Sequence, residues 1–248
     1  SFISTFTKMF PIEVTTMSKD VRERSIDPAS QDMLDLCQRA GLETAWDRLE
    51  KQQPQCGFGE LGLCCRNCNM GPCRIDPFGE GASKGVCGAT ADIIVARNLI
   101  RMIAAGAAAH SDHGRGVAHT FKLVSEGKAP SYQVKDQAKM ERLMNEYGVD
   151  SQMALAEAIM AEFGRQEGPI RFTRRAPAKR VELWEKLGID PRGIDREIVE
   201  IMHRTHIGVD NDPVHLILQG LRASIADGWG GSMIATELQD VLFGTPTP

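Results

Sequence analysis

Through most of the chain, apolar residues recur three or four positions apart, which is the spacing of one face of an α-helix. The longest such segment runs from Thr90 to about Val124 and is rich in small residues, so we expect a long helix deep in the fold. Turn residues separate further predicted helices over Lys135–Tyr147, Gln152–Phe163, Ala178–Leu187, Asp195–His206, Pro213–Ala226 and near Ser232–Leu242. No useful length alternates with period two, so nothing predicts a sheet.

The first 56 residues are less regular. Residues 1–26 mix Phe, Thr, Ser and Met without a period and are interpreted as an N-terminal arm. Residues 28–53 predict two short helices with a break at Gly41. The segment from Cys56 to Gly88 is rich in Gly, Pro and Cys, so its order must come from something other than a packed core, such as a metal centre. The fold class is therefore all-α with one loop-rich cysteine segment, in a domain over 27–248.

Composition excludes several classes of protein. The 248 residues are 42% hydrophobic and 25% charged, which is typical of a globular chain rather than a disordered one. The net charge of -4 lacks the basic excess that a nucleic-acid partner requires. The most apolar stretch, Met102–Ala109, is too short for a membrane span, and the start shows no signal-peptide pattern. We expect a soluble, cytoplasmic protein.

Six of the seven cysteines fall between Cys56 and Cys87, and with no export signal this clustering favours metal ligation over disulfides. Four of them, spaced by two, four and thirteen residues, complete one tetrathiolate site: Cys65, Cys68, Cys73 and Cys87. Zinc and iron-sulfur clusters both accept four thiolates. A single Cys-x-x-Cys knuckle followed by a Gly-Pro-Cys turn and a distant fourth cysteine favours a cubane, and the spacing differs from that of bacterial ferredoxins.

Cys56 and Cys64 remain, and two thiolates are half of what a cluster needs. The two-fold axis of a homodimer would bring two plus two together. Adjacent side chains of an extended segment point opposite ways, so Cys64 and Cys65 are expected to serve different sites. The alternative is a local disulfide or two free thiols. Cys37, near Leu34 on a helix face, is expected to be a small buried hydrophobe.

Several motifs together resemble the N-terminal domain of the anaerobic nickel-iron carbon-monoxide dehydrogenases. They are CGFGELGLCCRNCNMGPCRI, GVCGA, IVARN, AAGAAAHSDHGR, DNDPVHLI and FGTPTP, spread over about Asp27 to Pro248. The resemblance implies a homodimeric enzyme in which a helical domain precedes two Rossmann-like domains with a nickel-iron-sulfur active centre. The ligands of that centre lie in those later domains, and this sequence has no cysteine after Cys87. The chain is therefore interpreted as part of a longer enzyme and is not expected to oxidise CO alone.

The same resemblance implies roles for the cysteines. It makes Cys65, Cys68, Cys73 and Cys87 the ligands of one 4Fe-4S cluster per chain. It makes Cys56 and Cys64 the ligands of a cluster shared across the dimer, and their separation resembles that of members with a cubane there. Electrons from the reaction CO + H2O to CO2 + 2 H+ + 2 electrons would pass through both clusters to a ferredoxin-like acceptor. An acetyl-CoA synthase is a further partner that the resemblance admits.

Histidines and arginines offer weaker signals. His110, His113 and His119 are expected along one face of the long helix. The resemblance implies a proton-relay row of four histidines at steps of three, with Gly116 in the third place; the alternative is a set of polar surface residues. A structural role is favoured for His203, His206 and His215. A basic run is interpreted as a solvated face, with steering of an acidic partner as the alternative: Arg171, Arg174, Arg175, Lys179 and Arg180.

Two other functions compete with an electron relay. A zinc ion at the same cysteines would make the chain a non-redox dimerisation module. A free-standing ferredoxin-like carrier is the second, but it would need no large helical body.

Overall fold

The computed structural model describes residues 20–164, 168 and 170–247. The chain divides into two compact units, with residues 1–56 in unit 1 and residues 57–248 in unit 2. Most of the predicted arm, residues 1–19, lies outside the described residues. The predicted division into an arm over 1–26 and a domain over 27–248 stays a prediction.

Unit 1 contains the two predicted short helices, α3 (Pro28–Arg39) and α4 (Ala45–Lys51), after the single turn α2 (Val21–Arg24). Gly41 follows α3 with φ +66°, and the left-handed backbone there confirms the predicted break. A capping box between Thr44 and Asp47 begins α4. Arg24 is buried and pairs with Asp47 at 2.9 Å and with Glu50 at 3.0 Å, which joins α2 to α4.

Unit 2 confirms the all-α fold class. Its helices are α5 (Gly57–Glu60), α6 (Ala91–Ser125), α7 (Gln137–Tyr147), α8 (Gln152–Gly164), α9 (Ala178–Leu187), α10 (Ile194–Arg204), α11 (Pro213–Ala226) and α12 (Met233–Phe243), with a 3-10 turn η1 (Arg171–Arg175) and a π-helical segment η2 (Asp227–Ser232). The predicted helices match these bounds to within two residues at each end, because each carries a clear apolar face.

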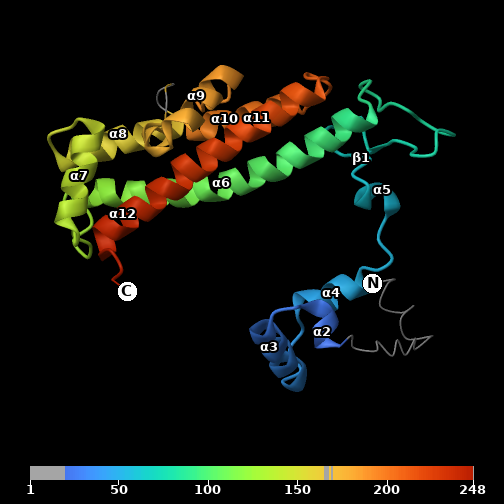
Figure 1. The fold of residues 1–248 in the computed structure, drawn as a ribbon, viewed down its shortest axis with the longest axis horizontal. Coiled ribbons are helices and arrows are strands. Elements are labelled where there is room, and N and C mark those ends of the chain that lie inside the picture. Colours follow the sequence, from blue (N-terminus) through green and yellow to red (C-terminus); the bar gives the residue numbers. More distant parts are fainter. Residues whose placement is uncertain (1–19, 165–167, 169, 248) are drawn as a thin grey trace. The chain divides into compact units, whose positions relative to one another are not determined.

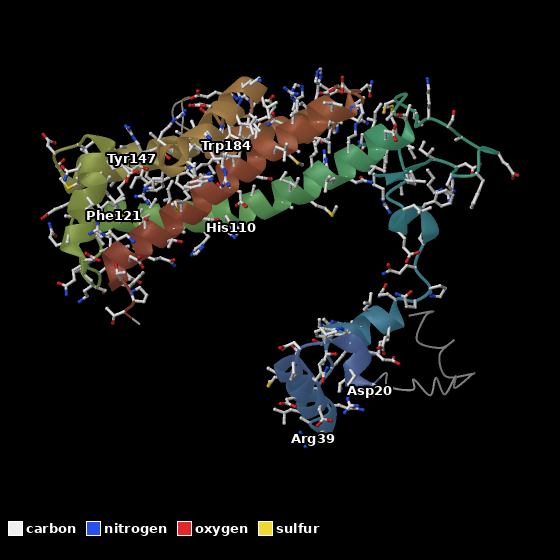
Figure 2. The ribbon with its side chains drawn as sticks, viewed as in Figure 1. Asp20, Arg39, His110, Phe121, Tyr147 and Trp184 are labelled. Carbon is white, nitrogen blue, oxygen red and sulfur yellow. The ribbon has the colours of Figure 1, made fainter. Side chains whose placement is uncertain are left out.

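The long helix α6 is the centre of unit 2, and α8, α10, α11 and α12 pack on it (Figure 1). One core cluster surrounds its C-terminal half, where Phe121 and Tyr147 lie (Figure 2). A second surrounds its N-terminal half, around Ile94 and Ile100. The opposite face exposes Val95 and Met102, so only one side of α6 lies deep.

The hydropathy of α6 also bears on the predicted absence of a membrane span. Among the described residues it is the one helix long and apolar enough to cross a bilayer, with a mean hydropathy of 1.3 over its best window. The core helix of a soluble protein passes the same test, and α6 is packed against four helices.

The chain stays helical from α11 through η2 into α12, although the Gly-rich residues there predict a break before Ser232. Two glycines, which have no Cβ atom, allow the helical path to continue where it crosses α6. A Cβ on Gly114 of α6 would lie 2.5 Å from the carbonyl oxygen of Gly231, and one on Gly231 would lie 2.9 Å from the carbonyl of His110. Paired glycines therefore let η2 and α6 cross in close backbone contact.

The cysteine segment differs from expectation in two respects. Its two-residue strands β1 (Cys64–Cys65) and β2 (Cys73–Arg74) form a small antiparallel ladder, although nothing predicts a sheet. Cys65 and Ile75 are also buried in the core cluster at the N-terminal half of α6. The prediction that this segment has no packed core is thus wrong in part, because isolated apolar residues without a period carry the contact.

Candidate metal centre

Four cysteines of unit 2 line one pocket, at the N-terminal end of α6. They are the four singled out by their spacing: Cys65, Cys68, Cys73 and Cys87. Its cavity volume is about 10 Å³, which is room for about one water molecule. Ile94 and Arg97 of α6 line it as well, and so do Thr205 and Ile207 from the segment between α10 and α11. The pocket therefore joins parts of the sequence that lie far apart.

The short ladder positions the first cysteines. Cys65 of β1 pairs with Cys73 of β2, which sets these two residues side by side. Gly71 lies in the turn between them, where a Cβ would be 2.9 Å from the carbonyl oxygen of Cys65. Gly85 packs against Cys73, with its hypothetical Cβ 3.4 Å from Sγ. Glycines at these two positions allow the backbone to wrap closely around the sulfurs.

Hydrogen bonds reach two of the sulfurs. The backbone N–H of Val86 donates to Sγ of Cys73 at 3.4 Å, and Nη1 of Arg97 donates to Sγ of Cys87 at 3.5 Å. Burial raises the pKa of the Cys87 thiol, but donation from Arg97 and from the backbone of Ala89 outweighs it, so the pKa lies below its ordinary value. Donation from Arg97 and Ala89 favours the thiolate form of Cys87, which is the form that binds metal.

The segment after α10 covers Cys87. A Cβ on Gly208 would lie 3.2 Å from Cβ of Cys87, and the neighbouring Ile207 has φ +48°, which is strained for a β-branched residue. Nη2 of Arg97 donates to the carbonyl of Asp210 at 3.0 Å and to Oδ1 of Asn211 at 2.8 Å. We call residues 205–211 the cover segment.

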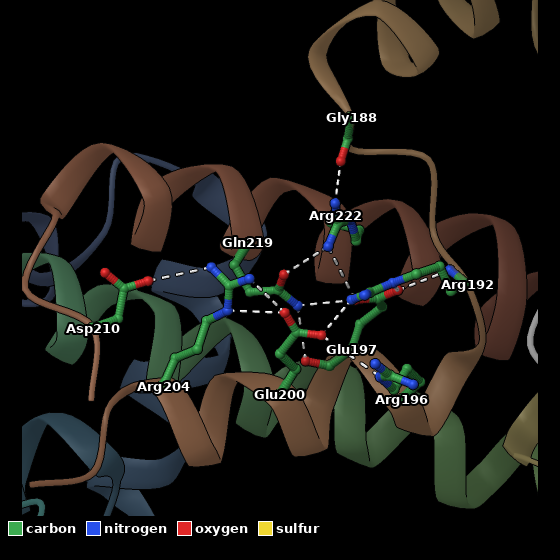
Figure 3. Close-up of polar contacts among 9 residues, drawn as sticks. All are labelled: Gly188, Arg192, Arg196, Glu197, Glu200, Arg204, Asp210, Gln219 and Arg222. Atoms are coloured by element: carbon green, nitrogen blue, oxygen red, sulfur yellow. Dashed lines mark hydrogen bonds and ion pairs between the residues drawn. The ribbon is translucent and has the colours of Figure 1, made fainter.

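A polar network on α10 and α11 supports this cover segment (Figure 3). Arg204 pairs with Asp210 at 3.2 Å and with Glu200 at 2.6 Å. Glu197 is fully buried beneath them, where Arg192 and Nε2 of Gln219 each bond to it at 2.9 Å. Because each buried carboxylate oxygen has a donor, the network holds α10 and the cover segment in one arrangement.

The donor set fits a cluster of several atoms. No three Cys, His, Asp or Glu side chains of the described residues form a group that could hold one metal ion. The four thiols instead line the wall of a shared pocket. Such a wall of four thiolates is the donor set that 4Fe-4S clusters use.

The other cysteines lie outside this pocket. Cys56 is exposed at the end of unit 1. Cys64 is half-buried in β1, next to Cys65 in sequence, and its carbonyl accepts a hydrogen bond from Asn98 at 3.1 Å. Cys37 is half-buried beside Met33 and Leu34. It is therefore less enclosed than expected.

The three histidines of the predicted row lie on α6 and are exposed. Nδ1 of His110 lies 2.6 Å from Oδ1 of Asp227 in η2 (Figure 2 labels His110). Nε2 of His113 lies 3.4 Å from Nε2 of Gln239 in α12, and His119 is one further turn and a half along. At Gly116 a Cβ would meet open space. His203, His206 and His215 are exposed and lie outside the pocket.

The basic run is exposed, as the interpretation of a solvated face expects, and two of its arginines form ion pairs. Arg174 pairs with Glu185 and Asp190, at 2.9 and 2.5 Å. Arg175 pairs with Glu146 and Glu237, both at 2.6 Å. Carboxylates on neighbouring elements therefore pair with these two arginines at the surface.

Spacing among the cysteines does not reveal the pocket residues contributed by the helices. Arg97 had a detectable signal, since it lies three or four positions from Ile93, Ile94 and Ile100 and thus on the apolar face. Thr205 and Ile207 had none, because nothing local places them against cysteines more than a hundred residues earlier.

Comparison with known proteins gives consistent matches. Residues 63–248 match the Prismane/CO dehydrogenase family. Carbon monoxide dehydrogenase 1 of Methanosarcina mazei is 67% identical over 240 residues, covering 94% of this chain and 38% of the relative. The chain therefore spans little more than a third of the length of that relative.

Two solved structures agree with the fold. The carbon monoxide dehydrogenase of Thermococcus sp. AM4, as isolated without nickel, superposes with a TM-score of 0.84 at 54% identity. The superposition covers 92% of this chain and 37% of the Thermococcus chain. An acetyl-CoA synthase/carbon monoxide dehydrogenase with NiZn[Fe4S4] and NiNi[Fe4S4] clusters in its alpha subunits has a TM-score of 0.82 at 40% identity, covering 93% of this chain and 36% of that one.

Proposed function

Because the chain belongs to the Prismane/CO dehydrogenase family, we propose that it is the electron-relaying part of an anaerobic carbon monoxide dehydrogenase. The enzyme would convert CO and water to CO2, protons and two electrons. The nickel-iron-sulfur active centre would lie in the rest of the polypeptide, since this chain matches about 38% of its relative's length. The single observation that carries the proposal is the pocket lined by four thiols within a fold shared with carbon monoxide dehydrogenases.

The four pocket cysteines would hold one 4Fe-4S cluster per chain. Such a cluster accepts and donates single electrons. The chain's own residues would tie it down through four thiolates and shield it with Ile94 and Ile207. Two sulfurs already receive hydrogen bonds, from Val86 and Arg97, and such donors stabilise thiolate ligands.

Cys56 and Cys64 would together supply half of the ligands for a second cluster, and the same two residues of a partner subunit would supply the other half. Support comes from β1, in which Cys65 lines the pocket and its neighbour Cys64 does not. Adjacent residues of a strand point to opposite faces, so Cys64 is available for a different site.

The partners and surroundings follow from this function. The shared site implies a homodimer, and a ferredoxin-like protein would take the electrons. An acetyl-CoA synthase is a further partner, on the pattern of the relative that combines both enzymes. His110, His113 and His119 would lead protons away along α6. We place the protein in the cytoplasm.

Zinc at the same cysteines is the rival function. Zinc uses the same four thiolates. The cluster is favoured by the fold that the chain shares with carbon monoxide dehydrogenases. A free-standing ferredoxin-like carrier is disfavoured by the large helical body that surrounds α6.

Metal analysis tests the proposal. Anaerobically purified protein should contain iron and acid-labile sulfide, absorb broadly in the visible range and bleach with dithionite. Cys68→Ser should lose the iron of one cubane per chain and unfold at a lower temperature, because the loop between β1 and β2 then loses a covalent anchor.

Cys37→Ser is the matched control, since this cysteine lies outside the pocket. It should keep the full iron content. Stoichiometric zinc without sulfide in the wild type, or unchanged iron in Cys68→Ser, would refute the proposed relay.

A further inference from the structure

Arg97 is the largest fully buried side chain among the described residues, with 1% of its surface exposed. It lies on the apolar face of α6 and lines the cysteine pocket. Burying a guanidinium without a compensating opposite charge costs on the order of several kcal/mol. Its position therefore requires an explanation.

No carboxylate of the described residues forms an ion pair with Arg97. The guanidinium contacts Sγ of Cys87, the carbonyl of Asp210 and Oδ1 of Asn211, and none of these is a carboxylate oxygen. Its Nε has no hydrogen-bond partner. The Arg24 side chain, which is 7% exposed, by contrast contacts the carboxylates of Asp47 and Glu50.

The anion that Arg97 lacks is supplied by the pocket itself. Four thiolates around an iron-sulfur cubane carry net negative charge, and one-electron reduction adds another. A fixed positive charge at hydrogen-bond distance from one of these sulfurs stabilises the more negative, reduced state. The effect is large in a buried site because little solvent screens the charge.

We propose that Arg97 is a positioning residue that raises the reduction potential of the cluster at Cys87 and at the same time fixes the cover segment over it. This inference rests on the proposed function. One Nη of Arg97 contacts the ligand sulfur and the other contacts Asp210 and Asn211, so one side chain serves both purposes. The strained backbone of Ile207 lies in the segment that Arg97 anchors.

Arg101 provides a matched control on the same helix, one turn further on. Its Nε donates to Oγ1 of Thr205 at 2.8 Å, so it also anchors the cover segment. Unlike Arg97, it does not line the pocket. Loss of Arg101 therefore removes an anchor without removing the charge next to the sulfur.

The test is a potentiometric titration of the complete polypeptide, purified anaerobically. Reduction of the cluster is monitored through the visible absorption that is absent from Cys68→Ser. With iron content retained, Arg97→Met should lower the reduced-to-oxidised ratio at a fixed potential at least tenfold, equivalent to a 59 mV shift for one electron. Arg97→Lys, which keeps the charge, should recover part of this shift. Arg101→Met should leave the ratio unchanged.

An unchanged ratio in iron-loaded Arg97→Met would overturn the inference, and so would an equal shift in Arg101→Met. Should Arg97→Met bind no iron, Arg97→Gln is titrated in its place, since its amide still donates hydrogen bonds but carries no charge; the same tenfold fall is expected. Wild-type protein without iron and sulfide would instead refute the proposed function, which separates the two failures.

Discussion

At the scale of single residues, Glu162 carries the clearest consequence for stability. Its side chain is buried at the C-terminal end of α8, where Oε1 accepts a hydrogen bond from the backbone of Arg171 and Oε2 has no partner. Burial raises its pKa to about 7, and the negative charge of Glu146 adds to this, while Arg171 and Tyr147 oppose it.

We predict that this carboxyl makes the protein less stable as pH rises. Below pH 4.5 both folded and unfolded forms are protonated, and the folded form stays so up to about pH 7. Stability is therefore lost progressively between these values, by about 3 kcal/mol in total. Glu162→Gln should abolish this part of the pH dependence in urea unfolding at pH 5 and pH 8.

The control is Glu182→Gln, which alters an exposed carboxyl of α9. It should follow the wild-type pH dependence. If the free energy of unfolding fell equally between pH 5 and pH 8 in Glu162→Gln and wild type, the buried carboxyl would be ionised at no cost.

The sequence predicts residue roles where chemistry and spacing coincide. The four pocket cysteines are identified by their spacing, and the structure brings them together. For Arg97 the sequence indicates only a place on the apolar face of its helix, and neither its contacts nor those of Glu162 are predictable, because they form only once the helices have packed. The neighbours of Arg97 and Glu162 come from the cover segment and from η1, which no local pattern connects to α6 or α8.

At the scale of elements, the crossing of α6 and η2 depends on the absence of two side chains. We predict that Gly114→Ala lowers the free energy of unfolding by about 1–3 kcal/mol, because its methyl group would overlap the carbonyl of Gly231. Thermal unfolding followed by circular dichroism measures this effect.

Gly116→Ala is its matched partner on the same helix. A methyl group there meets nothing within 4 Å, so the better helix propensity of alanine should stabilise the protein by up to about 1 kcal/mol. Equal effects of the two substitutions would show that η2 does not approach α6 as closely as described.

Helices with a clear apolar face are predictable from the sequence, and α7 to α12 confirm this within two residues. The continuous path through η2 is not predictable in this way. Asp227, Gly228 and Gly230 favour a turn when considered locally. Packing against α6 overrides that preference, because only glycines fit the contact.

At the scale of the whole molecule, the proposed shared cluster at Cys56 and Cys64 would couple cluster binding to assembly. We predict that the double change Cys56→Ser with Cys64→Ser removes half a cubane of iron per chain and weakens the dimer, since a ligand bound only by the assembled state stabilises it. Iron analysis with analytical ultracentrifugation measures both. The pocket cluster should remain.

Two results would contradict this prediction. One is an iron content equal to that of the wild type. The other is the same iron loss on substitution when the wild-type protein sediments as a stable monomer, because a shared site then has no partner to complete it.

The fold class and the family resemblance follow from the sequence as a whole. The way the pocket closes does not, because it depends on the cover segment and on the network around Glu197. These contacts join residues more than a hundred positions apart, and each is specified only after α6, α10 and α11 have packed together.

The pocket cysteines and the cover segment lie far apart in the sequence, so they are synthesised at different times. The cysteines leave the ribosome first, and the 120 positions from Cys87 to Ile207 take roughly ten seconds to translate. For that interval the thiols of the nascent loop have neither Ile207 nor Gly208 over them. A cluster delivered to the growing polypeptide would therefore meet an uncovered pocket, whereas one delivered to the finished apoprotein would meet the cover segment.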